Sequence, residues 1–139
     1  MPVPNIEMHI STPAREVLVD MTEKVQRALV DAQPSLTGAV TIFIPHTTAG
    51  VTINEGADPS VARDIVDGLQ RLVPRDAGYR HGEGNSDAHV KASLMGSSVT
   101  VPVDQGRLRL GTWQSIYFAE FDGPRTRQVW LVPLSSTGV

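Results

Sequence analysis

The stretch "WQSIYFAEFDGPRTRQVWLV" (residues 113–132) decides the predicted fold class. Within it, two runs rich in valine, isoleucine and aromatic residues, 113–121 and 127–132, flank the turn-forming segment DGPRT. This pattern is typical of a β-hairpin. Just upstream, the runs 98–103 and 107–111 flank the tripeptide DQG and predict another hairpin. The C-terminal half is therefore predicted to be an antiparallel meander.

The N-terminal half combines short strands with single helices. Apolar alternation and β-branched residues predict strands over residues 6–11, 15–20, 38–45 and 50–54. Helical spacing and end signals predict a helix from Thr22 to Pro34, one after the Asp58–Pro59 cap, and one between a Ser86 cap and Gly96. Because strands outnumber helices and the helices are inserted singly, we expect an α+β fold: a largely antiparallel β-sandwich or sheet with about three helices.

Composition excludes several classes of protein. The chain has 139 residues, 40% hydrophobic residues and a net charge of -3, so we expect a single domain, residues 1–139, that does not bind nucleic acid. It lacks cysteine, which excludes disulfides and thiolate sites. The sequence shows no signal-peptide pattern and no apolar run of the ~20 residues that a membrane span needs. We therefore expect a cytoplasmic protein without membrane contact.

The segment "RHGEGNSDAH" (residues 80–89) holds two of the four histidines, with a polar residue at every second position from His81 to His89. In an extended strand these two rings would be about 26 Å apart, too far to share one ion. Gly82 and Gly84 favour turns instead, so we expect a loop that runs into the start of a helix.

In the first turn of that helix, His89 would be kept neutral by the helix dipole and could ligate a metal or act as a base. The free amide groups of the same turn favour an anion. Glu83 and Asp87 would supply oxygen ligands for a cation. A purely structural role stays open, with Asp87 stabilising the helix start and His89 covering an edge.

Two further clusters carry polar residues at element ends. In "PHTTAGVTINEGADP" (residues 45–59), a histidine and two threonines follow one apolar strand, and an asparagine and a glutamate end the next. In "LGTWQS", a tryptophan and a glutamine start a strand. Structural roles remain open for both clusters. Among the arginines that border the 80–89 loop, Arg80 is a candidate for steering an anionic ligand. None of the fixed-spacing metal, phosphate or nucleophile motifs is present, so the residues alone predict a polar, histidine-rich pocket assembled from loops.

Together, "PHTTAGVTINEGADP", "YRHGEGNSDAHVKASLMGSSVTVPV" and "GRLRLGTWQSIYFAEFDGPR" resemble the YjbQ-like family, also called the secondary thiamine-phosphate synthase enzyme family. The resemblance extends from about residue 6 to residue 132 and shows no departure at a motif position. It implies a compact α+β sandwich that assembles as a homotrimer with sites at subunit interfaces. The motif positions fall on His46, Thr47, Thr48, Asn54, Glu55, His81, Glu83, Asn85, Asp87, His89, Trp113 and Gln114.

The resemblance also implies a weak thiamine-phosphate synthase activity, a transferase reaction on small phosphorylated substrates. In this hypothesis a divalent cation, Mg²⁺ or Zn²⁺, assists. The residues expected to be catalytic are His46, Glu55, Glu83 and His89; those expected to bind substrate are Thr47, Thr48, Asn54, Arg80, Asn85, Trp113 and Gln114; and those expected to bind metal are His46, His81, Glu83, Asp87 and His89. Two alternatives stay open: a zinc-like hydrolase or lyase with Glu83 as base, and a non-catalytic trimer that binds a phosphorylated metabolite.

Overall fold

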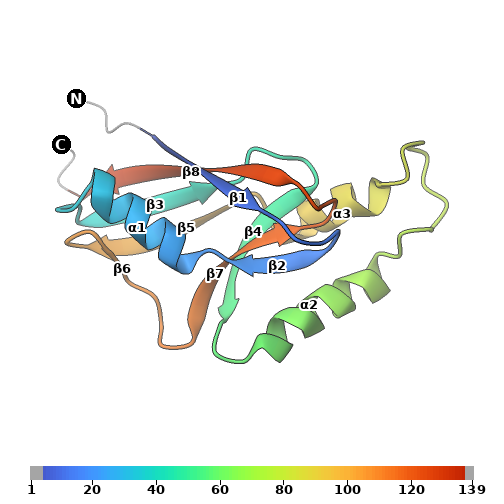
Figure 1. Ribbon diagram of the computed structural model, residues 1–139, viewed down its shortest axis with the longest axis horizontal. Coiled ribbons are helices and arrows are strands. Elements are labelled where there is room, and N and C mark those ends of the chain that lie inside the picture. Colours follow the sequence, from blue (N-terminus) through green and yellow to red (C-terminus); the bar gives the residue numbers. More distant parts are fainter. Residues whose placement is uncertain (1–4, 137–139) are drawn as a thin grey trace.

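Two antiparallel sheets form the framework of the protein in the computed structural model, which describes residues 5–136. The elements follow in the order β1 (Ile6–Ser11), β2 (Val17–Asp20), α1 (Thr22–Ala32), β3 (Gly38–Phe43), β4 (Ala49–Glu55), α2 (Pro59–Leu72), α3 (Ser86–Met95), β5 (Ser98–Asp104), β6 (Arg107–Leu108), β7 (Gln114–Glu120) and β8 (Thr126–Ser135). One sheet has the strand order β1-β8-β3-β5-β6 and the other the order β2-β7-β4 (Figure 1). The predicted α+β class with three helices is confirmed.

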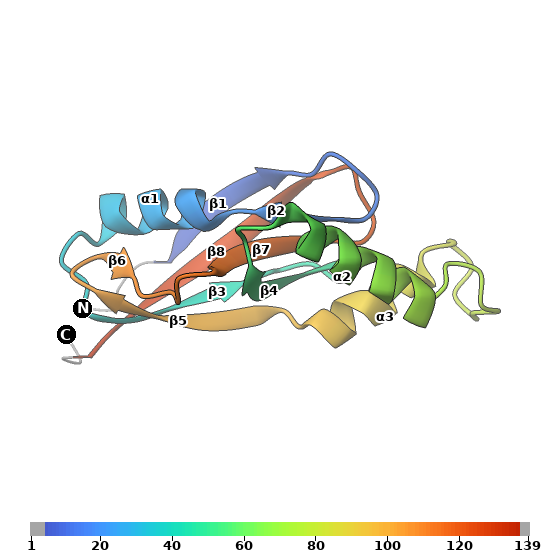
Figure 2. The same cartoon turned by 90° about the horizontal axis from the view of Figure 1, so that it is seen from below.

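The elements are arranged in layers around two cores. Helix α1 and the three-stranded sheet both pack on one face of the five-stranded sheet, while α2 and α3 cover the opposite face of the three-stranded sheet (Figure 2). Val25 and Leu29 of α1 join the larger core together with residues from both sheets. None of the helices in the described part of the chain is long and apolar enough to cross a membrane.

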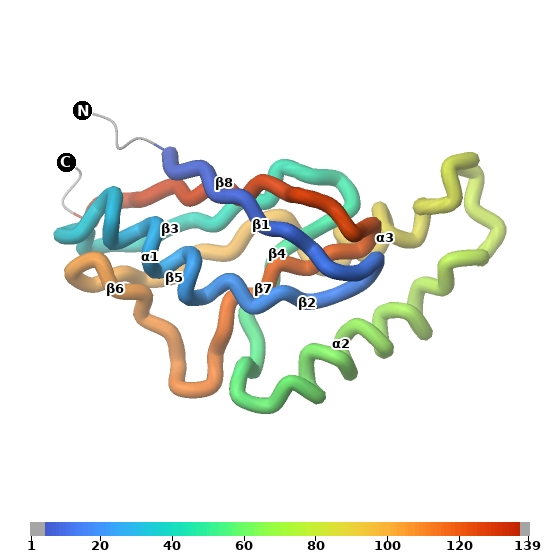
Figure 3. Tube along the Cα trace, in the orientation of Figure 1, coloured from blue at the N-terminus to red at the C-terminus, as the bar shows by residue number. Residues whose placement is uncertain are grey.

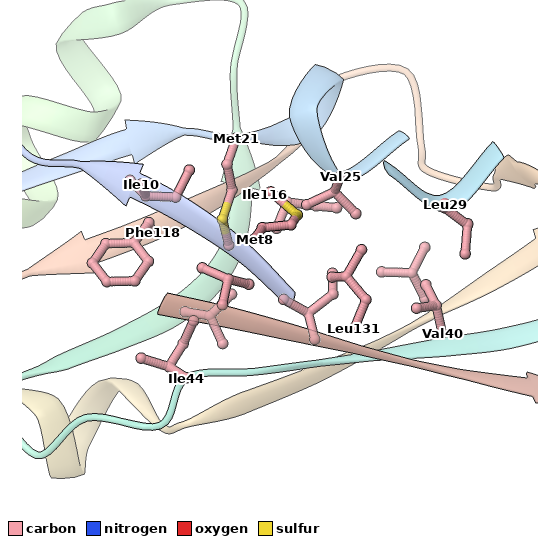
Figure 4. Close-up of a cluster of buried hydrophobic side chains, with 14 of the residues drawn as sticks. Met8, Ile10, Met21, Val25, Leu29, Val40, Ile44, Ile116, Phe118 and Leu131 are labelled. Atoms are coloured by element: carbon pink, nitrogen blue, oxygen red, sulfur yellow. The ribbon is translucent and has the colours of Figure 1, made fainter. Parts of the chain in front are cut away.

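Strand β7 lies between both cores, and its side chains alternate between them. Ile116 and Phe118 point into the larger core, which Figure 4 shows together with Met8 and Leu131. Tyr117 belongs to the other core, against α2 and α3. Because both of its faces are buried, β7 has the nearly continuous apolar sequence that such strands show.

One of the two predicted hairpins is confirmed and the other is wrong. Strands β5 and β6 pair in antiparallel register, with Val103 opposite Leu108. Strands β7 and β8, however, lie in different sheets: β7 pairs with β2 and β4, and β8 pairs with β1 and β3. Since each strand already has a partner on both edges, the two face each other across the larger core, and the DGPRT segment carries the chain from one sheet to the other.

The helices begin and end close to the predicted positions. Asp58 caps α2 by accepting a hydrogen bond from the Ser60 backbone N–H at 2.9 Å, with Pro59 as the first helical residue. Gly96 follows α3 with a φ of 95°, a value that favours glycine. The predicted Ser86 cap is wrong: the cap position belongs to Asn85, and Ser86 is already a buried residue of the first turn.

Replacing Phe118 with alanine tests the shared core. Because this ring is fully buried between the sheets, we expect the free energy of unfolding to fall by about 3–5 kcal/mol. The control, Leu72→Ala at the end of α2, removes a side chain that is 77% exposed and should change it by less than about 0.5 kcal/mol. Urea unfolding of both variants checks this, and equal losses would contradict the layer arrangement.

Candidate functional site

A surface hollow of about 520 Å³ brings two of the predicted histidines together. His46 and Thr47, from the segment between β3 and β4, line one side with Ala49. His89 of α3 lines the other side, and the remaining lining residues are Ala92, Ser93, Gly96 and Ser97. Imidazole and hydroxyl groups from segments far apart in the sequence therefore surround one space, as the sequence predicted for His46, Thr47 and His89.

The close approach of α3 to β4 shapes this hollow. Gly50 of β4 contacts the end of the helix, and a Cβ atom added there would lie 2.5 Å from the Gly96 carbonyl oxygen. The same carbonyl accepts a hydrogen bond from the Val51 N–H at 3.1 Å. A glycine at position 50 is therefore needed to bring the His89 helix this close to the strand that follows His46.

His46 completes the hydrogen bonding of the five-stranded sheet beyond the end of β3. Strand β3 stops at Phe43, opposite Trp130, so it offers no carbonyl to the next donor on β8. The Gln128 backbone N–H donates instead to His46 Nε2 at 2.9 Å. Burial, followed by the charge of Arg127, lowers the pKa of His46. The ring is therefore neutral at neutral pH, and its Nε2 atom is already engaged.

His81, from the loop that precedes α3, contacts the His89 ring. The rings of His81 and His89 are in edge-to-face contact, with centroids 5.5 Å apart. His81 Nε2 is 3.5 Å from Glu83 Oε2, and both of these side chains are exposed. They belong to the segment 73–85, which projects away from the sheets between α2 and α3 (Figure 3). His81 therefore contacts His89, and His89 in turn lines the hollow together with His46.

The predicted metal ligands do not converge on one point within a single chain. Among residues 5–136, no group of three histidine, aspartate or glutamate side chains is placed to hold a metal ion. His46 Nε2 accepts a backbone N–H, and Glu83 pairs with the exposed His81. The donor set of one chain therefore does not fit a three-ligand metal site.

Asp87 lies in a separate buried ion network. Arg15 donates to both of its carboxylate oxygens, at 3.0 and 3.2 Å, and Lys91 Nζ donates to one of them at 2.8 Å. Lys91 also donates to Glu16 at 2.5 Å. Burial alone would raise the pKa of Asp87, but the hydrogen bonds and charges of Arg15 and Lys91 outweigh it and lower the pKa to about 2. Both oxygens of Asp87 are therefore taken by this network.

A second set of predicted site residues lies at the opposite end of β4. Asn54 and Glu55 are paired there with the start of β7, and Glu55 Oε2 accepts the Asp58 N–H at 2.7 Å. Gln114 accepts the Gly111 N–H at 2.8 Å, and the neighbouring indole of Trp113 is 64% exposed. Six residue steps along a strand span roughly 20 Å. The structure therefore separates this set from the hollow within one chain.

The remaining predicted residues have individual environments. Arg80 is exposed on the projecting segment 73–85. Asn85 donates from Nδ2 to Asp122 Oδ2 at 3.0 Å, which points its side chain toward the turn between β7 and β8. Thr48 is buried and accepts a hydrogen bond from Arg127 at 2.9 Å. Only Arg80 of these three has a side chain open to a ligand.

Two buried charged residues next to the site were not predicted. Glu120 is fully buried and pairs with Arg127, which is 5% exposed. The alternation of inward and outward residues along the strands could have revealed them. Glu120 lies two residues after Phe118 on the inward face of β7, and Arg127 lies two residues before Val129 on the inward face of β8. A charged residue at an inward position of an apolar strand indicates a buried partner.

A known protein family matches nearly the same part of the chain as the sequence motifs did. The family model described as UPF0047 protein YjbQ-like matches residues 6–136. The UPF0047 protein MJ1081 of Methanocaldococcus jannaschii is 50% identical over 122 residues, which is 88% of each chain. The UPF0047 protein YugU of Bacillus subtilis is 46% identical over 125 residues, covering 89% of this chain and 94% of the relative.

Solved structures share the fold. A crystal structure of an uncharacterized conserved yjbq/upf0047 family protein from Clostridium acetobutylicum has a TM-score of 0.88 and 49% identity, covering 93% of this chain and 99% of that one. The conserved hypothetical protein TT1486 of Thermus thermophilus has a TM-score of 0.87 and 47% identity, with the same coverage of both chains. The two-sheet architecture with its three helices therefore recurs in proteins of similar sequence.

Replacing Asp87 with asparagine tests the buried network. In the wild type the lowered pKa means that the stability Asp87 contributes is fully present above about pH 4 and is lost as the pH falls through about 2. Asp87→Asn removes one of the two carboxylates that pair with Lys91 and Arg15 and leaves Glu16 as the other. We therefore expect a loss of about 3 kcal/mol at pH 7 and a shallower further decline between pH 4 and pH 2.

Urea unfolding at several pH values measures both effects. The control is Asp64→Asn, at an exposed position of α2, which should leave the slope of stability against pH close to that of the wild type. A slope that is equally steep in Asp87→Asn and the wild type would show that Asp87 does not carry this charge.

Proposed function

Since the chain belongs to the UPF0047 family of YjbQ-like proteins, as its sequence motifs predicted, we propose that it is a small-molecule enzyme that acts on phosphorylated substrates in the hollow between His46 and His89. The proposed activity is a weak transferase reaction of the thiamine-phosphate synthase type. The observation that carries the proposal is that two histidines distant in sequence line one hollow together with the hydroxyl groups of Thr47, Ser93 and Ser97.

The proposed reaction has two bond changes. The bond between the pyrimidine methylene carbon and the pyrophosphate oxygen breaks, and the pyrophosphate leaves with the electron pair. The ring nitrogen of the thiazole phosphate then forms the new bond to that carbon. Hydrogen-bond donors aimed at the departing oxygens lower the barrier for such a step. The hydroxyl groups and imidazoles of the hollow are donors of this kind.

The proposed divalent cation arrives with the substrate. One chain does not offer a carboxylate set for it, because Asp87 is held by Arg15 and Lys91 and Glu55 lies at the far end of β4. Mg²⁺ in proteins is commonly held through substrate phosphates with only one or two carboxylates. We therefore propose a cation–pyrophosphate complex as the substrate, with Glu83, an exposed carboxylate of the projecting segment, as a protein ligand of the cation.

The zinc-like hydrolase or lyase is the second candidate, and the contact between His81 and His89 is the observation that favours it. It requires His46 as a third ligand, although Nε2 of that ring already accepts the Gln128 N–H. The non-catalytic binder of a phosphorylated metabolite uses the same hollow as the transferase. Turnover separates these candidates, because only the first joins the pyrimidine methylene carbon to the thiazole nitrogen as pyrophosphate leaves.

We further propose a homotrimer with sites at its subunit interfaces. The outer face of the five-stranded sheet carries Phe43 stacked on Trp130, with ring centroids 5.8 Å apart, and the exposed side chain of Leu134. Exposed apolar groups gathered on one sheet face favour contact with another protein surface. If Trp113 and Gln114 act in the same site as His89, a neighbouring subunit has to supply them, because one chain holds them at opposite ends of β4.

Sedimentation analysis tests the assembly. We expect a native mass three times that of the 15.0 kDa chain. Trp130→Ser removes the largest apolar group of the outer sheet face and should shift the protein toward smaller species. Leu72→Ser, which removes an exposed apolar side chain from α2, should leave the mass unchanged. A monomer in the wild type would contradict the proposal.

Removal of the His89 ring tests the hollow as the active site. We expect His89→Ala to lower the rate of pyrophosphate release from the pyrimidine pyrophosphate and thiazole phosphate pair at least about tenfold, because a positioned imidazole contributes on this scale or more. Val90→Thr, at the next and exposed position of α3, controls for damage to the helix and should keep the wild-type rate.

The rate is measured with Mg²⁺ present and absent, together with calorimetric binding of pyrophosphate. Wild-type activity in His89→Ala would show that the reaction occurs elsewhere. Pyrophosphate binding without any turnover in the wild type would favour the binder.

A further inference from the structure

The segment that carries His46 is hydrogen-bonded to residues at the end of β7 and the start of β8. Arg127 Nη2 donates to Thr48 Oγ1 at 2.9 Å, and the Phe121 N–H donates to the Thr48 carbonyl oxygen at 3.2 Å. The Gln128 N–H, one residue after the arginine, donates to His46 Nε2. Residues 46 and 48 are thus both hydrogen-bonded to the stretch where the chain passes from one sheet to the other.

A buried ion pair, Glu120 with Arg127, fixes the guanidinium group that bonds to Thr48. Arg127 Nε donates to Glu120 Oε1 at 2.8 Å, and Arg127 Nη2 donates to Glu120 Oε2. Thr12 donates to Glu120 Oε1 at 2.8 Å, and the Asp122 N–H donates to Oε2 at 3.0 Å. A buried ion pair often adds little net stability over a well-packed apolar pair. Its distinctive contribution here is geometric, because the guanidinium fixed by Glu120 also donates to Thr48.

These contacts determine which nitrogen of His46 is available to a ligand. A backbone N–H donates to Nε2, so that atom carries no proton, and in the neutral ring the proton is on Nδ1. Within residues 5–136, no protein group is hydrogen-bonded to Nδ1, and the ring lines the hollow. The group that His46 can offer to a ligand is therefore an N–H donor. The ring does not offer a free lone pair that could bind a metal or act as a base.

We propose that Arg127 is a positioning residue: fixed by Glu120, it holds Thr48 and thereby locks His46 as an Nδ1–H donor toward an anionic oxygen in the hollow. This inference rests on the proposed function and deepens it by assigning His46 the recognition of the substrate's phosphate oxygens. The donor forms a hydrogen bond and transfers no proton, so the role requires only that the ring keep this tautomer and orientation.

The competing interpretation is that the Glu120–Arg127 pair only ties the two sheets together. In that case, loss of the pair would lower the stability of the whole domain and leave the His46 ring unchanged in molecules that remain folded. A readout of the ring itself, made without any ligand, distinguishes the two interpretations.

The experiment uses protein labelled with ¹⁵N at histidine and long-range proton–nitrogen correlation, which reports the tautomer of each ring. In the wild type we expect a single His46 signal with the proton on Nδ1. Arg127→Met removes the hold entirely and should give a mixture of tautomers. Thr48→Val, which loses only one hydroxyl group, should give a smaller shift in the same direction, and Thr48→Ser should restore the wild-type signal.

The matched control is Arg125→Met, which removes a nearby positive charge. Among residues 5–136, the hydrogen bonds of the Arg125 side chain go to Asp122 alone. This variant should leave both the tautomer and the affinity for pyrophosphate unchanged, whereas Arg127→Met should weaken pyrophosphate binding about tenfold. If Arg127→Met fails to fold, Thr48→Val and Thr48→Ser decide the question.

The inference is overturned if folded Thr48→Val and Arg127→Met both keep the wild-type tautomer. It is also overturned if the wild type carries the His46 proton on Nε2. If the wild type has the expected tautomer but does not bind pyrophosphate, the proposed function is contradicted. The positioning of the His46 ring by Arg127 and Thr48 would still be supported.

Discussion

The buried pair of Glu120 and Arg127 is the contact on which the arrangement of the two sheets and of the His46 segment depends. Glu120 ends β7 in the three-stranded sheet, and Arg127 is the second residue of β8 in the five-stranded sheet, so their bond crosses the space between the layers. Burial alone would raise the pKa of Glu120, but hydrogen bonds from Arg127, the Asp122 backbone N–H and Thr12, with the charge of Arg127, outweigh it and lower the pKa. The carboxylate therefore stays ionised inside the protein, and Arg127 retains an N–H group for Thr48.

The Glu120–Arg127 pair spans the place where the chain changes sheets, although the sequence indicated a hairpin there. Local signals around DGPRT describe a turn between two strands, and both strands exist. They do not reveal which edges are already taken, because the strands that flank β7 and β8 come from the N-terminal half of the chain. Pairing between segments that distant depends on the packing of the two sheets around the larger core, which a local pattern does not report.

Other parts of the fold were accessible from sequence because their signals are local. The Asp58–Pro59 start of α2 and the glycine after α3 act through their own backbone geometry, and both lie at the predicted positions. The site was accessible only in part. His46 and His89 share a hollow as predicted, but the sequence does not show that Asp87 faces Arg15 and Lys91 rather than the histidines. The position of Asp87 on α3 determines where its side chain points. Its partners Arg15 and Lys91 come from the loop before β2 and from the next turn of α3.

His46 is proposed to meet its ligand with a fixed N–H group, and a high-resolution crystal structure of the protein with pyrophosphate bound would show this contact. We expect a phosphate oxygen about 3 Å from His46 Nδ1, within the hollow lined by Ser93 and Ser97, while Nε2 keeps its bond to the Gln128 backbone. Pyrophosphate bound away from this hollow, or a ring turned so that Nε2 faces the anion, would refute the proposed role of His46.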